Sequence, residues 1–214
     1  HLHIAGYFNI KNFWYGSLKK KIIDLKAERE KQNIRITVSL VPQFDASGKW
    51  DGGLLDLLTC VDILMMSEAE ALSITKSDNL SGAAHVLNDA SPDTIAVVTR
   101  SSQGAVVLQN CTQTLSQSAA SVELVDPTGA GDAFAAGFLY GFLDCLPQCS
   151  ENKRIPAEVA KQGLKWGCAV GSANVMTAGA SNPSAKMLIE KCYFNQGRED
   201  LKEVISVSEN SNQV

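Results

Sequence analysis

Short apolar segments that alternate with amphipathic ones constrain the fold of this chain more than any other feature of its sequence. Residues 94–99 read Thr-Ile-Ala-Val-Val-Thr, an almost continuous apolar run that is typical of a parallel strand covered on both faces. Residues 34–40 alternate and are rich in β-branched side chains, which also predicts a strand. Residues 14–32 carry apolar side chains at helical spacing. The alternation predicts an α/β fold: a doubly wound, mostly parallel sheet with helices on both faces.

The same patterns predict the remaining elements. Short apolar stretches indicate further strands at residues 2–5, 63–66, 104–108 and 122–125. Helices are expected in a short stretch before residue 63, in the Gly-, Ala- and Phe-rich run 129–143, and from Pro156, which suits a first helical turn, to about residue 177. We expect one domain over residues 1–194, followed by a polar tail at 195–214.

Charge and hydropathy exclude several classes of protein. The 214 residues carry a net charge of −4, which argues against a nucleic-acid binder. No apolar stretch reaches the roughly 18 residues that span a membrane, and no secretory signal is visible. The six cysteines match neither a disulfide framework nor a paired zinc motif, Cys145 and Cys149 being the only close pair. We therefore expect a cytoplasmic protein that binds neither nucleic acid nor membrane.

Residues 125–134, which read Val-Asp-Pro-Thr-Gly-Ala-Gly-Asp-Ala-Phe, carry the clearest chemical pattern. A strand is expected to end here, and a small-residue turn leads into a helix whose first N–H groups are unpaired. Gly129 and Gly131 let an anion approach the backbone closely. The helix N-terminus adds a partial positive charge of about half a unit. The segment therefore predicts an anion site.

Asp132 gives this anion site a possible reaction. A carboxylate in the first helical turn would repel a phosphate that was only bound there. Beside a hydroxyl that attacks a γ-phosphate, the same carboxylate can accept the departing proton. The amides of Gly129, Ala130 and Gly131 would then stabilise the charge of the transferring group. The alternative is purely structural, because an Asp also caps helices and small residues also pack them.

Other nucleotide-binding motifs fit the segment less well. A phosphate-binding loop of the Walker type needs Gly-Lys followed by Ser or Thr, and the chain has no such sequence. A dinucleotide-binding turn needs Gly or Ala where Phe134 stands, and it belongs near the start of a βαβ unit. A dehydrogenase is therefore disfavoured.

Asp126–Gly137 resembles the C-terminal signature of the PfkB carbohydrate kinase family, which includes ribokinase, fructokinase and adenosine kinase. The resemblance implies that Asp132 is the catalytic base and that Gly129, Ala130 and Gly131 form the anion hole. It also implies ATP and magnesium as cofactors and a sugar or nucleoside as the small-molecule substrate. In many members an Asp at the position of Asp126 and the carbonyls of a nearby loop hold a monovalent cation such as potassium.

Three further stretches are similar to family motifs. Residues 62–70 resemble a strand that ends in Asn-x-x-Glu, so that Glu70 would organise magnesium from its outer shell, although Ser67 replaces the Asn. Residues 99–105 resemble a Thr-x-Gly-x-x-Gly turn over the nucleotide, with Ser101 in place of the first Gly. Residues 171–180 look like the helix and loop beside the adenine. The nucleotide-binding residues implied are Thr99, Ser101, Gly104, Asn174, Gly179 and Ala180. In the structural alternative, Glu70 is an exposed helix residue and Asn174 a helix-interior amide.

The family's N-terminal Gly-Gly-x-x-x-Asn motif, sugar-contacting Asp and small β-sheet lid have no counterpart in these 214 residues. We therefore expect an N-terminally incomplete member whose whole protein is a homodimer. The favoured function is ATP-dependent phosphoryl transfer to an alcohol group of a small molecule, with a sugar as the best candidate. The alternative is a truncated, non-catalytic nucleotide-binding relative.

Overall fold

A six-stranded β-sheet forms the centre of the fold. The computed structural model describes residues 1–146 and 155–180. The strands are β1 (Leu2–Ala5), β2 (Val38–Val41), β3 (Ile63–Ser67), β4 (Ile95–Thr99), β5 (Ala105–Gln109) and β6 (Thr112–Gln117), and they lie side by side in chain order. The first four strands are parallel, whereas β5 and β6 are antiparallel to their neighbours. The expected mostly parallel α/β sheet is thus confirmed.

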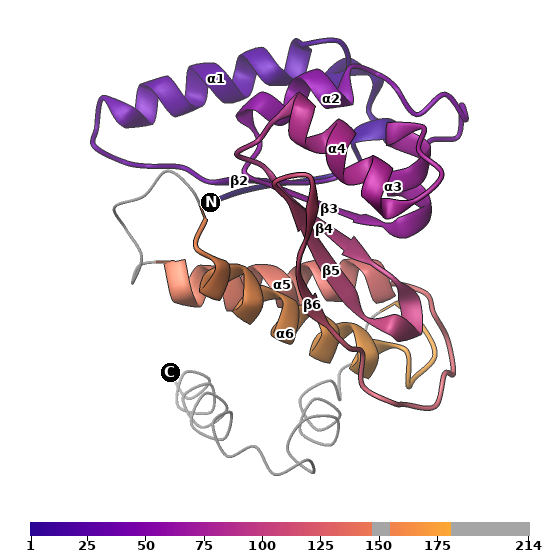
Figure 1. The fold of residues 1–214 in the computed structure, drawn as a ribbon. Helices are drawn as coiled ribbons and strands as arrows, with labels where there is room; N and C mark the ends of the chain where they lie inside the picture. Colours follow the sequence, from indigo (N-terminus) through magenta and orange to yellow (C-terminus); the bar gives the residue numbers. More distant parts are fainter. Residues whose placement is uncertain (147–154, 181–214) are drawn as a thin grey trace.

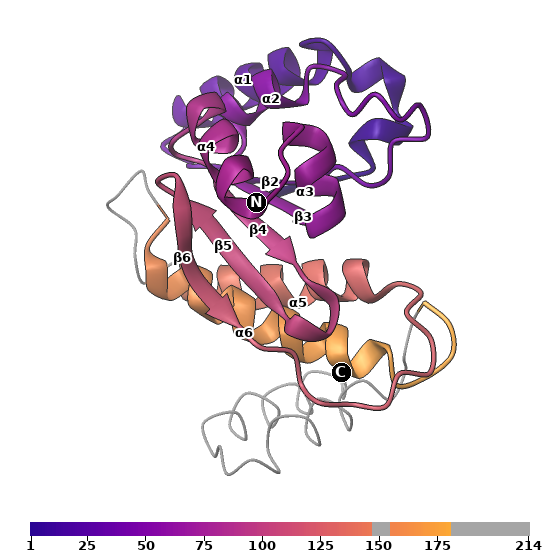
Figure 2. The same cartoon turned by 45° about the vertical axis from the view of Figure 1, so that its right-hand side comes forward.

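Helices cover both faces of the sheet, as predicted (Figures 1 and 2). One face carries α1 (Ser17–Glu30), α2 (Leu54–Leu57), α3 (Glu68–Thr75) and α4 (Leu80–Ala90), which connect the parallel strands. The opposite face carries α5 (Ala130–Cys145) and α6 (Ala157–Asn174), which follow the last strand. The connections between parallel strands therefore share one face, and the second layer consists of two successive helices. Among the described helices, none combines the length and apolarity needed to cross a lipid bilayer.

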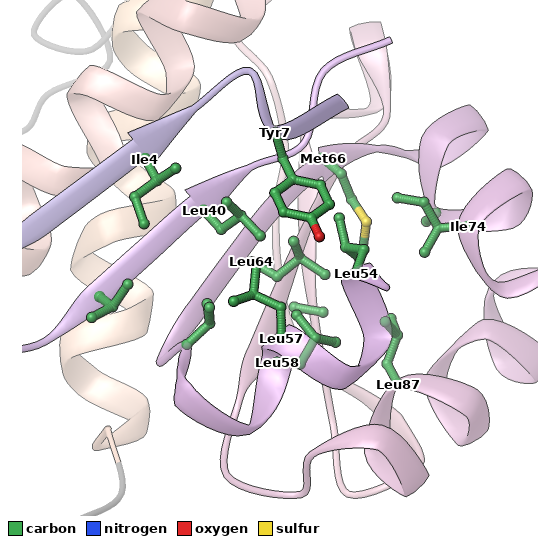
Figure 3. Packing of buried hydrophobic residues seen from close by; sticks show 14 of the residues in the cluster. Ile4, Tyr7, Leu40, Leu54, Leu57, Leu58, Leu64, Met66, Ile74 and Leu87 are labelled. Atoms are coloured by element: carbon green, nitrogen blue, oxygen red, sulfur yellow. The ribbon is translucent and has the colours of Figure 1, made fainter. Parts of the chain in front are cut away.

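Side chains of β3 show how the sheet separates two hydrophobic cores. Leu64 and Met66 belong to the core under α1–α4, which also contains Leu57 of α2 (Figure 3). Ile63 and Met65 belong to the core under α5 and α6. All four side chains are almost fully buried. The alternation follows from the period of two in a strand, and it explains why this strand has no polar face.

Glycines bring α5 and α6 into close contact. A Cβ atom added at Gly137 would lie 2.6 Å from the backbone oxygen of Trp166, and one at Gly163 would lie 2.7 Å from the ring of Phe138. Only glycine leaves room for such an approach. The position of α5 on the sheet is therefore linked to that of α6.

Two predicted strands differ from the observed ones, and one observed strand was not predicted. Residues 122–125 form no strand; Leu124 and Val125 are 63% and 57% exposed, and the Val125 amide donates to the Val175 carbonyl instead of a neighbouring strand. The strand expected over 34–40 begins only at Val38. The unpredicted β6 is polar and half exposed, and it forms because Asn110 and Cys111, both with positive φ, close a tight hairpin turn after β5.

Several expectations concern residues outside the described ranges. These are the polar tail at 195–214, the end of the domain at 181–194, and Cys149 with its close spacing to Cys145.

Candidate active site

The predicted site residues meet at one edge of the sheet. The strands β3 and β4 end at Ser67 and Thr99, α5 begins at Ala130, and α6 ends at Asn174. All four positions lie on the right-hand side of the molecule in Figure 1. Ligands of open α/β sheets bind at the carboxyl ends of parallel strands, so the arrangement marks this edge as the candidate site.

The turn before α5 requires glycine at position 129. Gly129 is the N-cap residue, its φ is +76°, and an added Cβ would lie 2.7 Å from the Ala180 carbonyl oxygen. The Ala130 amide donates to the Pro127 carbonyl at 3.1 Å. Within the described ranges, the amides of Gly129 and Gly131 have no such acceptor. Two of the three amides expected in the anion hole are therefore available to a ligand.

Asp132 lies exposed in the first turn of α5. The N-cap residue is Gly129, and no side chain caps the helix. No hydrogen-bond partner of the Asp132 carboxylate is present among the described residues, so the carboxylate is available at the helix N-terminus. Burial lowers the pKa of His3, and the negative charge of Asp132 opposes that shift, which places this charge near β1.

Asp126 joins the turn before α5 to the loop after α6. Its Oδ1 accepts a hydrogen bond from the Thr128 amide at 2.9 Å, and its Oδ2 accepts one from the Gly179 amide at 2.9 Å. These bonds, that from Gly179 first, hold the pKa of Asp126 below its ordinary value. The Asp126 carboxylate is thus ionised, and each of its oxygens accepts a hydrogen bond from a backbone amide.

Asn174 acts on the same turn from the last position of α6. Its side chain is buried, with 4% exposure, and its Nδ2 donates to the Thr128 carbonyl at 2.9 Å. The next residue, Val175, accepts hydrogen bonds from the Val125 and Asp126 amides at 2.8 and 3.2 Å. In this structure Asn174 therefore holds the turn that starts α5. Gly179 and Ala180 contact the same turn from the following loop.

The turn between β4 and β5 keeps a glycine-like backbone despite Ser101. Ser101 has a φ of +51°, in the left-handed region that normally favours glycine. Gly104 has a φ of +89°, and an added Cβ would collide with the Gln117 carbonyl oxygen. The Arg100 amide closes the turn by donating to the Gly104 carbonyl at 2.7 Å. Thr99 ends the strand, and its hydroxyl lies 3.5 Å from the Met66 carbonyl oxygen.

Ser67 and Glu70 form a reciprocal capping box at the start of α3. The Glu70 amide donates to the Ser67 Oγ at 3.2 Å, and the Ser67 amide and hydroxyl donate to Glu70 Oε2 at 2.7 and 2.9 Å. The pattern Ser-x-x-Glu after a strand is a known signal for this motif, and sequence analysis overlooked it. One carboxylate oxygen of Glu70 is thus engaged within the chain.

An ion pair at the same edge was also missed. Arg100 Nε lies 3.2 Å from Glu68 Oε2, so a cation and a carboxylate flank the ends of β3 and β4. No pattern in the sequence joins two residues that lie 32 positions apart. Among the described residues, no group of three or more His, Cys, Asp or Glu side chains forms a metal cage. The carboxylates present at this edge are those of Glu68 and Glu70. Such a set fits magnesium, which proteins commonly hold through one or two carboxylates, water and substrate phosphates.

Comparison with known proteins gives one family match and one curated relative. The family described as pfkB family carbohydrate kinase matches residues 2–187. A cytidine kinase from Thermococcus kodakarensis is 34% identical over 136 residues, which make up 62% of this chain and 48% of that protein. The chain thus spans about half the length of this curated relative.

Solved structures share the fold. A double mutant of fructokinase from Vibrio cholerae O395, with fructose, ADP and a potassium ion bound, matches with a TM-score of 0.65 at 19% identity, over 88% of this chain and 60% of that one. A ribokinase from Giardia lamblia matches with a TM-score of 0.67 at 14% identity, over 82% and 56%. At these identities the likeness establishes the fold alone.

We expect Gly129 and Gly131 to respond differently to alanine. Gly129→Ala should lower the free energy of unfolding by at least about 1 kcal/mol, because the new methyl group is strained by its φ and meets Ala180. An added Cβ at Gly131 meets no atom within 4 Å, so Gly131→Ala should change stability by less than about 1 kcal/mol. Urea unfolding of both variants measures the difference, and equal losses would contradict this account of the turn.

The hydrogen bonds to Asp126 should break on acidification. Because the folded-state pKa is lowered, the stabilisation is fully present above the unfolded pKa and is lost as the pH falls through the folded pKa. The Gly179 amide resonance, followed by NMR, should titrate with a midpoint below the ordinary value of 3.8. In Asp126→Asn this titration should disappear. A midpoint at or above 3.8 in the unaltered chain would show that these hydrogen bonds do not stabilise the ionised Asp126 carboxylate.

Proposed function

Because the family match covers residues 2–187, the chain belongs to the pfkB family of carbohydrate kinases, and we propose that it forms the nucleotide-binding and catalytic region of an ATP-dependent phosphotransferase. The observation that carries the proposal is the free Asp132 carboxylate beside the available amides of Gly129 and Gly131. A base and an anion-binding backbone at one helix N-terminus are what phosphoryl transfer to an alcohol needs from a protein.

In the proposed reaction, Asp132 accepts the proton of the acceptor hydroxyl. The oxygen attacks the γ-phosphorus of ATP, a new P–O bond forms, and the bond between the γ-phosphorus and the bridging oxygen breaks, so that ADP leaves. The amides of Gly129 and Gly131 and the positive end of α5 stabilise negative charge on the transferring group. Asp132 lies in the same first turn of α5 as these amides, so that the proton acceptor and the anion donors share one rigid element.

The nucleotide is proposed to lie between two loops. The turn Thr99–Gly104 would flank it on one side, and the loop with Gly179 and Ala180 on the other. Magnesium would neutralise phosphate charge, with Glu70 contributing from the outer shell through the carboxylate oxygen that the capping box leaves open. A potassium-like ion near Asp126 is consistent with the potassium ion in the fructokinase structure.

The acceptor is proposed to be a small molecule with an alcohol group. The curated relative is described as a cytidine kinase and the solved neighbours as a fructokinase and a ribokinase, so both a nucleoside and a sugar have support. A cytoplasmic location and a homodimer remain proposals for the whole protein. A non-catalytic nucleotide-binding role is the second candidate, favoured by the engagement of Glu70 with Ser67.

Replacement of Asp132 distinguishes the two functions. Asp132→Asn keeps the size of the side chain but cannot take up a proton. In the complete protein it should reduce turnover by about 10²-fold or more, with similar ATP affinity. A coupled assay of ADP release and ATP-binding calorimetry measure both quantities. Turnover within a few-fold of the unaltered protein would rule out Asp132 as the base, and absence of turnover in the unaltered protein would favour the non-catalytic role.

The magnesium requirement tests Glu70. Glu70→Gln keeps an oxygen acceptor for the capping box but removes the charge, so the magnesium concentration for half-maximal rate should rise. Glu28→Gln, at an exposed position on α1, provides the matched control. If the magnesium titrations of both variants match that of the unaltered protein, Glu70 is a capping residue and nothing more.

A further inference from the structure

Two amide side chains meet beyond the ends of β1 and β2. Asn9 Nδ2 donates to Gln43 Oε1 at 2.9 Å, and this pair is exposed to solvent. Among the described residues, neither side chain has another hydrogen-bond partner. Whichever amide donates, such a pair leaves one carbonyl oxygen and one NH₂ group for a ligand. The pair therefore retains both an acceptor and a donor that a ligand can use.

The amide pair lies level with Asp132 along the sheet. The ring of His1, just before β1, lies 6.0 Å from the ring of Phe142 on α5, and α5 runs in the direction opposite to the parallel strands (Figure 1). Asp132 precedes Phe142 by ten residues, or about 15 Å of helix. At about 3.3 Å per residue, the same distance along β1 ends near Gly6. A Cβ added at Gly6 would lie 3.0 Å from Gln43 Oε1.

The order of strands separates this pair from the nucleotide loops. The loops at residues 67–70 and 99–104 follow β3 and β4, whereas Asn9 and Gln43 follow β1 and β2. Asp132 influences His3 on β1, so its carboxylate lies toward the β1 side of this edge. A molecule whose hydroxyl points at Asp132 can extend along the edge toward the amide pair without entering the nucleotide side.

The surrounding loops hold the pair in place. The Phe8 amide donates to the Pro42 carbonyl at 3.1 Å, which joins the two loops directly. The Trp50 ring contacts the rings of Phe8 and Phe44 edge to face, each at 5.5 Å. The Trp50 amide in turn donates to the buried Asp45 carboxylate at 2.7 Å. Such support reduces the entropy lost on binding a ligand.

Strain and exposure also favour a binding role. Gln43 has a φ of +59°, which is uncommon for a residue other than glycine, and such outliers concentrate at functional sites. Phe44, the next residue, is 68% exposed although its ring packs edge-on against Trp50. Exposed aromatic rings stack on nucleobases, and Asn and Gln form paired hydrogen bonds with the edges of bases.

We propose that the Asn9–Gln43 amide pair and Phe44 recognise the acceptor of the phosphoryl transfer, and that this acceptor is a nucleoside. A base offers both a flat face for the aromatic ring and an edge with a donor beside an acceptor, whereas a simple sugar has only hydroxyls. The inference rests on the proposed kinase function for the identity of the site, but its test does not depend on catalysis.

Binding to the 214-residue chain provides the test. Calorimetry with cytidine, adenosine, ribose and fructose, in the presence of ADP, should show tighter binding of at least one nucleoside than of either sugar. Gln43→Leu should weaken nucleoside binding about 10- to 100-fold, the range for loss of a paired contact to a base. Gln113→Leu, an exposed glutamine on β6, serves as the matched control and should bind as the unaltered chain does.

Phe44→Ala is a second variant that we expect to fold normally, because a side chain this exposed contributes little to the core. It should weaken nucleoside binding without changing the affinity for ribose. Sugars that bind as tightly as nucleosides, no nucleoside binding, or unaltered nucleoside affinity in both Gln43→Leu and Phe44→Ala would each overturn the inference. Nucleosides that bind through Gln43 but accept no phosphate would support the inference and contradict the proposed function.

Discussion

The contact between the turn that starts α5 and the end of α6 is the constraint on which the candidate site depends. Asp126 receives the Gly179 amide, Asn174 donates to the Thr128 carbonyl, and Gly129 lies against Ala180. These three contacts join residues about 50 positions apart in the chain. They determine where the first amides of α5 point, and therefore where an anion can bind. The glycine contacts between α5 and α6 extend the same constraint along both helices.

Electrostatics at the start of α5 satisfy two opposite requirements. The free amides and the helix dipole attract an anion, while the carboxylate of Asp132 in the same first turn repels it. In a site that only binds phosphate, this carboxylate would weaken affinity. In a site that transfers a phosphoryl group, it removes the proton of the attacking hydroxyl. The arrangement is therefore the main support for the proposed phosphoryl transfer.

The two departures from the family pattern keep the local backbone. Ser101 adopts the left-handed conformation that a glycine would adopt, and Ser67 caps α3 through its hydroxyl and amide contacts with Glu70. The capping role of Glu70 could be predicted from the spacing Ser-x-x-Glu. The sequence did not show which carboxylate oxygen of Glu70 stays open to the proposed magnesium ion, because that depends on the hydrogen bonds of the capping box.

Much of the fold followed from the sequence, since burial on both faces imposes continuous apolar strands such as 94–99, and a period of 3.6 residues identifies the helical segments. Polar β6 was not predicted and residues 122–125 were wrongly assigned to a strand, because both depend on neighbouring chain segments rather than on local pattern. The sequence alone also located Asp132 and its glycines, because a helix N-terminus is a local feature. Only the tertiary structure decided that Asn174 supports the turn and that Asn9 meets Gln43. Contacts between residues distant in the chain arise from packing, which local periodicity does not encode.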